Sequence, residues 1–125
     1  MTHPFRAAVE TRDLPSLSAQ LAEDVTFNSP VAFHPFRGRE VVTEVLRNVM
    51  EVFSDFTYVD DLEGAESHAL VFTATVAGRE VQGLDHLRFD DDGLVSELTV
   101  MVRPLSGVIA LAEAMAPRVA GLAKG

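Results

Sequence analysis

The stretch GLDHLRFDDDGLVSELTVMV, residues 83–102, decides the fold of this chain. Two alternating runs flank the turn signal DDDG at 90–93, and this arrangement predicts a β-hairpin. Successive side chains of a strand point to opposite faces. One face of the first run therefore carries Gly83, Asp85, Leu87 and Phe89. This is the apolar face, so Asp85 raises the question of what a carboxyl group does there.

The neighbouring segments extend the hairpin into an antiparallel meander covered by helices. Further strands are predicted at 55–63 and 68–78, and the hairpin strands extend over 79–90 and 94–104. Before them, REVVTEVLRNVMEVF at 39–53 has one broad apolar stripe at helical spacing. The remaining segments predict two short N-terminal helices, a strand at 24–30, an aromatic loop at 31–38, and a last helix from 105 that kinks or ends near Pro117. This order indicates an α+β fold, with helices against one face of a bent sheet.

Composition excludes several classes of function. The net charge of −9 argues against nucleic-acid and anionic membrane partners, which reward Lys and Arg. The chain contains no cysteine, so disulfides and thiolate metal sites are excluded. No apolar run approaches the ~20 residues that span a bilayer, and the first residues lack an apolar signal core. We expect a cytoplasmic protein whose residues 1–125 form one domain.

The segments LAEDVTFNSPVAFHPFRGREVV (21–42) and GLDHLRFDDDGLVSELTVMV (83–102) resemble the NTF2-like superfamily, in particular its SnoaL-like and ketosteroid-isomerase-like members. The resemblance covers about residues 4–105. It implies a cone in which the curved antiparallel sheet wraps around the long helix, with an apolar pocket at the open end and an additional C-terminal helix. It also implies a homodimer that packs through the outer sheet face. Members of this superfamily include isomerases, hydrolases, cyclases and non-catalytic binding proteins.

The resemblance gives Asp85 a role. It falls where ketosteroid isomerases keep a protonated carboxyl group that stabilises a dienolate oxygen. The other catalytic residues of those isomerases are not present. Phe5 occupies the position of their tyrosine donor, and Ser29 occupies the position of their proton-shuttling aspartate. Phenylalanine donates no hydrogen bond and serine is a poor base at neutral pH, so ordinary steroid isomerisation is not expected. The strand at 68–77 has neither Arg nor Asp, which argues against epoxide-hydrolase chemistry of the limonene-epoxide type.

Three polar residues are candidates for the site, each with an alternative. Asp85 is either a hydrogen-bonded strand residue or a pocket acid whose pKa burial raises. His34 is either a surface loop histidine or a general base at the pocket mouth. Ser29 is either part of a turn beside Pro30 or a pocket residue that donates to a ligand.

Apolar side chains of several segments are expected to form the walls of the ligand pocket. They are Phe5, Phe27, Phe33, Phe53, Phe72, Leu98, Val100 and Val102. We expect no metal site, because no two histidines have ligand spacing, and we also expect no cofactor. His3 and His68 are expected in solvent, and His86 on the outer face of the sheet.

Two functions remain open at this point. In the first, the chain is an isomerase-, cyclase- or lyase-like enzyme that acts on a small apolar carbonyl compound of steroid, polyketide or terpenoid type. Asp85 would then be the hydrogen-bond donor to the oxyanion. Alternatively, the chain is a non-catalytic ligand-binding or dimeric interaction module. The expected dimer would cover the apolar outer face, which carries Ala69, Val71, Thr73, Thr75, Leu84, Thr99 and Met101.

Overall fold

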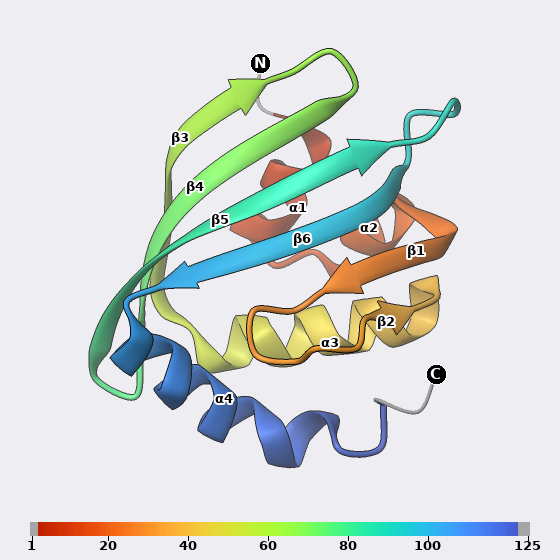
Figure 1. Cartoon of the computed structure of the whole chain (residues 1–125). Helices are drawn as coiled ribbons and strands as arrows, with labels where there is room; N and C mark the ends of the chain where they lie inside the picture. The colour runs from red at the N-terminus through yellow and green to blue at the C-terminus, as the bar shows by residue number, and fades with distance from the viewer. Residues whose placement is uncertain (1–2, 123–125) are drawn as a thin grey trace.

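The computed structural model describes residues 3–122 and has the predicted α+β architecture (Figure 1). Its helices are α1 (Pro4–Thr11), α2 (Leu14–Ala19), α3 (Arg39–Val52) and α4 (Leu105–Val119). Its strands are β1 (Leu21–Asn28), β2 (Phe36–Arg37), β3 (Ser54–Glu63), β4 (Ser67–Val76), β5 (Arg79–Phe89) and β6 (Val95–Arg103). The four long strands that the sequence predicts are all present, and no end differs from the predicted one by more than two residues.

The six strands form one curved sheet in the order β2-β1-β6-β5-β4-β3. Strands β3 to β6 are the expected antiparallel meander, and Asp85 on β5 lies between Leu70 of β4 and Val100 of β6. Strand β1 pairs in parallel with β6. Helices α1, α2 and α3 lie on the concave side of the sheet, and α4 runs beside α3 at the end of the cone (Figure 1).

The long helix α3 lies on the sheet because its apolar stripe needs a partner surface. Val42, Val45 and Leu46 of this stripe are buried, whereas its other face carries the exposed Glu40 and Glu51. Helix α2 begins at Leu14, because the side chain of its N-cap residue Asp13 accepts a hydrogen bond from the Ser16 amide.

One local expectation is corrected. The segment 31–38 is not wholly irregular, because β2 pairs antiparallel with β1 through Phe36 and Phe27. Helix α4 ends at Val119, two residues after Pro117 and thus close to the predicted end. Pro117 lies in the exposed last turn, where its missing N–H removes only one hydrogen bond. Within residues 3–122, no helix is both long enough and apolar enough to cross a membrane.

Candidate functional site

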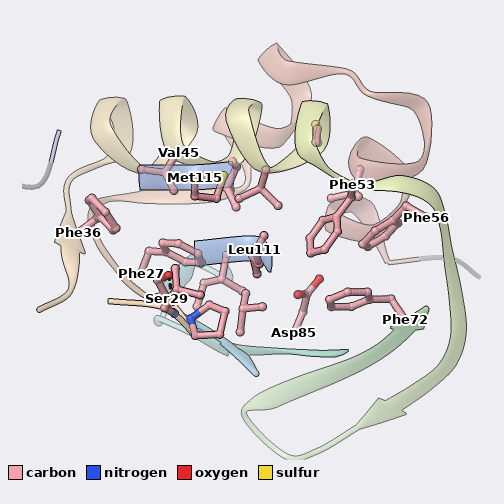
Figure 2. Close-up of a pocket in the computed structure, with 18 of the residues that line it drawn as sticks. Phe27, Ser29, Phe36, Val45, Phe53, Phe56, Phe72, Asp85, Leu111 and Met115 are labelled. Carbon is pink, nitrogen blue, oxygen red and sulfur yellow. Dashed lines mark hydrogen bonds between the residues drawn. The ribbon is translucent and has the colours of Figure 1, made fainter. Parts of the chain in front are cut away.

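A cavity of about 230 Å³ lies inside the cone, between the concave face of the sheet and helices α1, α3 and α4 (Figure 2). Most of its walls are apolar. Its charged side chains at the α1 end, Glu10 and Arg12, are exposed at the rim. Arg6 hydrogen-bonds to Glu10, and Arg12 donates to the Met50 carbonyl oxygen at 3.2 Å. The titratable groups inside the described cavity are therefore Asp85 and Tyr58.

Asp85 is the carboxyl group of this interior. The alternation of β5 turns its side chain to the concave face, where it is only 8% exposed and points into the cavity (Figure 2). Its Oδ2 accepts a hydrogen bond of 2.8 Å from the Tyr58 hydroxyl. Burial raises the pKa of Asp85 to about 7, against the smaller opposing effect of the Tyr58 hydrogen bond. A large share of this carboxyl group is therefore protonated near neutral pH.

Tyr58 is a polar residue inside the cavity that the sequence reasoning missed. It lies on β3, two strands away from Asp85, and is 5% exposed. Burial, followed by the nearby Asp85, raises the pKa of the Tyr58 phenol well above its ordinary value. The pairing of β3 with β4 shifts register on both sides of Tyr58. The alternation in DFTYVDDLE (55–63) indicates that Phe56 and Tyr58 lie on the same face of the strand. It does not predict the contact of Tyr58 with Asp85, because the two residues lie on different strands and the register of β3 shifts around Tyr58.

Aromatic rings enclose the Asp85 end of the cavity. The ring of Phe72 stacks on Phe56 at a centroid distance of 4.7 Å and meets Phe53 edge-on at 5.6 Å. Phe72 faces Gly83 across the β4–β5 ladder. A Cβ atom at Gly83 would lie 2.1 Å from the Phe72 ring, so only glycine leaves room for this ring beside Asp85.

Ser29 lines the cavity away from the aromatic end, on the segment that follows β1. Its Oγ accepts a hydrogen bond of 3.2 Å from the Val31 amide. Ser29 therefore stabilises a turn and also faces the cavity. The hydroxyl hydrogen remains available to a ligand.

Most of the expected wall residues line the cavity. Phe5, Phe27, Phe53, Phe72, Leu98 and Val100 all do so. Val102 does not; it is half-buried and packs against the hydrophobic core.

The expectations for Phe33 and His34 are corrected. Phe33 is 96% exposed, and its ring packs on the exposed His34 outside the cavity lining. The loop turns these two side chains outward because Val31 and Phe36 provide its inward contacts instead.

The remaining histidines lie outside the cavity. His68 was expected in solvent, but it is only 9% exposed and its Nε2 contacts Asp61. His3 packs on the His68 ring at 5.0 Å and caps α1 by accepting from the Phe5 amide. In the part of the chain that the structure describes, no group of three His, Cys, Asp or Glu residues is placed to hold a metal ion.

A family model for the SnoaL-like domain matches residues 3–98. The chain belongs to the SnoaL-like family. No curated protein matches it significantly. This SnoaL-like chain is 43% identical to a steroid delta-isomerase from Pseudomonas aeruginosa, with a TM-score of 0.87 over 93% of this chain and 86% of that one.

Two further solved structures share the fold of this SnoaL-like chain. A bacterial protein with a cystatin-like fold from Silicibacter pomeroyi DSS-3 is 33% identical, with a TM-score of 0.89 over 94% of this chain and 84% of that one. A SnoaL-like protein from Burkholderia thailandensis is 19% identical, with a TM-score of 0.68 over 81% of this chain and 90% of that one. One of these relatives is named as an isomerase. In this chain, however, Phe5 stands where the resemblance leads us to expect a tyrosine, and Ser29 stands where it leads us to expect an aspartate.

Proposed function

We propose that this SnoaL-like protein binds a small, uncharged, apolar carbonyl compound in the cone cavity and polarises it through Asp85. The observation that carries the proposal is a buried carboxyl group in an apolar cavity, hydrogen-bonded on one oxygen by Tyr58. Apolar walls with a few converging polar groups are typical of small-molecule sites. A charged ligand would lose more solvation in such a cavity than its few polar groups return.

The hydrogen-bond pattern makes the protonated form of Asp85 a donor. Tyr58 occupies Oδ2, and no other described residue hydrogen-bonds to this carboxyl group. The proton of the neutral acid therefore sits on Oδ1 and points to a ligand oxygen in the cavity. A donor fixed in an apolar site stabilises negative charge that develops on a carbonyl oxygen, as in enolisation. The identity of 43% with a steroid delta-isomerase supports this reaction class.

A second candidate function is ligand binding without turnover. Enolisation also needs a base beside the carbon that loses a proton. Ser29 and Phe5 stand where the resemblance expects an aspartate and a tyrosine, and both line the cavity. This difference favours a protein that binds and orients a carbonyl compound without moving a proton.

The test is a binding titration of cyclic enones against wild type and two variants at pH 6 and pH 8. Wild type should bind more tightly at pH 6, where Asp85 is protonated and can donate. Asp85→Asn keeps a neutral donor, so its affinity should be the same at both pH values. Asp85→Leu keeps the branched side-chain shape but has no donor, and its affinity should fall at least tenfold, the loss expected for an unpaired hydrogen-bonding group.

Turnover separates the two candidates. Exchange of the ketone's α-hydrogens in D₂O by wild type, lost in Asp85→Leu at a saturating ketone concentration, would indicate the enzyme. Binding without exchange would indicate the binding protein. Equal affinities of all three proteins for every enone at both pH values would refute a role of Asp85 in the site. The exposed turn residue Asp91 provides the matched control, since Asp91→Asn should leave binding unchanged.

A further inference from the structure

Helix α4 supplies one wall of the cavity from the end of the described chain. Leu111, Met115 and Val119 recur four residues apart, so they share one face of the helix, and all three line the cavity. Leu111 and Met115 are only 3% and 4% exposed. Figure 2 shows both side chains directed into the cavity that Asp85 also faces.

This wall lies outside the part of the chain that identifies the family. The family model ends at residue 98, whereas α4 covers Leu105–Val119. The features shared through the SnoaL-like match therefore supply Asp85 and the aromatic end of the cavity. Helix α4 follows the matched segment and contributes Leu111 and Met115 to the wall of the cavity.

Contacts near both ends of α4 hold this wall in place. Near its start, a Cβ atom at Gly107 would lie 2.3 Å from Val81 of β5, so glycine allows the helix to approach the sheet closely. Near its end, the Arg118 guanidinium donates to Glu51 at 2.7 Å and to the buried Asn48 at 3.1 Å, both on α3. Helix α4 is therefore fixed against two elements, and Leu111 and Met115 occupy defined positions in the cavity.

The cavity that remains is small. Its volume of about 230 Å³ lies below the ~300–1,000 Å³ of pockets that hold drug-sized ligands. A four-ring steroid belongs to that larger class. One- and two-ring carbonyl compounds are the class that fits without movement of α4.

We propose that Leu111 and Met115 set the size limit of this site, so that it selects one- or two-ring ketones and excludes four-ring steroids. This inference rests on the proposed function, since it concerns the ligand class of the same cavity. The inferred ligands are therefore smaller than the steroids after which the 43%-identical isomerase is named. The limit comes from side-chain volume on α4 and needs no change at Asp85.

The experiment measures the affinity of three probes of increasing size. The probes are cyclohex-2-enone with one ring, a fused two-ring enone, and androst-4-ene-3,17-dione with four rings. Wild type should bind a smaller enone at least tenfold more tightly than the steroid. Met115→Ala removes three heavy atoms from the wall and should increase steroid affinity about tenfold or more, since each methylene in a hydrophobic pocket changes discrimination by roughly that factor.

Two more variants guard against a simple loss of folding. Ala116 lines the cavity but is exposed, so Ala116→Leu adds volume without creating a buried void. It should weaken the two-ring enone at least tenfold and leave cyclohex-2-enone nearly unchanged. Ile109 is 50% exposed on α4 and does not line the cavity. Ile109→Ala is therefore the matched large-to-small control, which should keep the wild-type size ranking.

The outcomes separate this inference from the proposed function. Tighter binding of the steroid than of both smaller enones by wild type would overturn the size limit while supporting a carbonyl site. An unchanged size ranking in both Met115→Ala and Ala116→Leu would also overturn it. Failure of all three probes to bind wild type and Met115→Ala would count against the proposed function, and the size limit would fall with it.

Discussion

The burial of Asp85 should make the stability of this protein fall as pH rises, and replacement of Asp85 by asparagine should remove that dependence. Burial raises the pKa of Asp85 from its ordinary value of 3.8 to about 7. Between these two pH values the folded protein keeps a proton that the unfolded chain has released. The folded state thus binds more protons than the unfolded state, so the free energy of unfolding decreases with rising pH.

The size of the effect follows from the two pKa values. Each pH unit between them contributes about 1.4 kcal/mol, so ionisation of Asp85 costs the folded state about 4 kcal/mol in full. Asp85→Asn removes this cost, and the amide oxygen still accepts from Tyr58. The variant should therefore exceed wild type in stability by about 2 kcal/mol at pH 5 and about 4 kcal/mol at pH 8.

Urea unfolding of both proteins at pH 5, 6, 7 and 8 measures this difference. Contributions from other titrating groups cancel, because the two chains differ only at position 85. The exposed Asp91 supplies the control, since Asp91→Asn should change stability by less than about 0.5 kcal/mol at every pH. A difference between Asp85→Asn and wild type that is constant from pH 5 to pH 8 would refute the buried, protonated carboxyl group.

Three further substitutions test neighbouring parts of the site. Tyr58→Phe removes the hydrogen bond that lowers the pKa of Asp85, so a carboxyl NMR titration should give a pKa above the wild-type value; an equal or lower value would contradict the pairing. Gly83→Ala forces a methyl group against the Phe72 ring and should destabilise the fold by about 1–3 kcal/mol in urea unfolding, whereas no loss would show that the ring can move freely. His34→Ala should change neither enone affinity nor stability beyond about 0.5 kcal/mol, because His34 is exposed outside the cavity, and a tenfold loss of affinity in the same titration would return it to the site.

The hairpin that carries Asp85 shows what local pattern is able to predict. Alternation of side chains is a property of the strand itself, so the inward face of β5 followed from the order of its residues. The apolar stripe of α3 and the turn at 90–93 are equally local, and they predicted the α+β architecture that the structure confirms, whereas the cone was implied by the resemblance to the NTF2-like superfamily. The position of Asp85 on the buried face could thus be predicted from the sequence alone.

The hydrogen bond between Tyr58 and Asp85 could not be predicted in the same way. Tyr58 reaches Asp85 from two strands away, and that contact depends on the register of β3 against β4 and on the register shifts around Tyr58. The outward turn of Phe33 likewise depends on which loop side chains find room against the core. An exposed and a buried phenylalanine look alike in a sequence, because burial is a property of the packed neighbours.

By itself, then, the sequence determined the long helices and strands, the faces that they bury, and the presence of an acid on an apolar face, since each depends on residues close together in the chain. Only the tertiary structure decided the Tyr58–Asp85 hydrogen bond, the room that Gly83 leaves for Phe72, and the closure of the cavity by Leu111 and Met115. These features arise between segments that are far apart in sequence. Their energies depend on distances that strand register and helix packing set together.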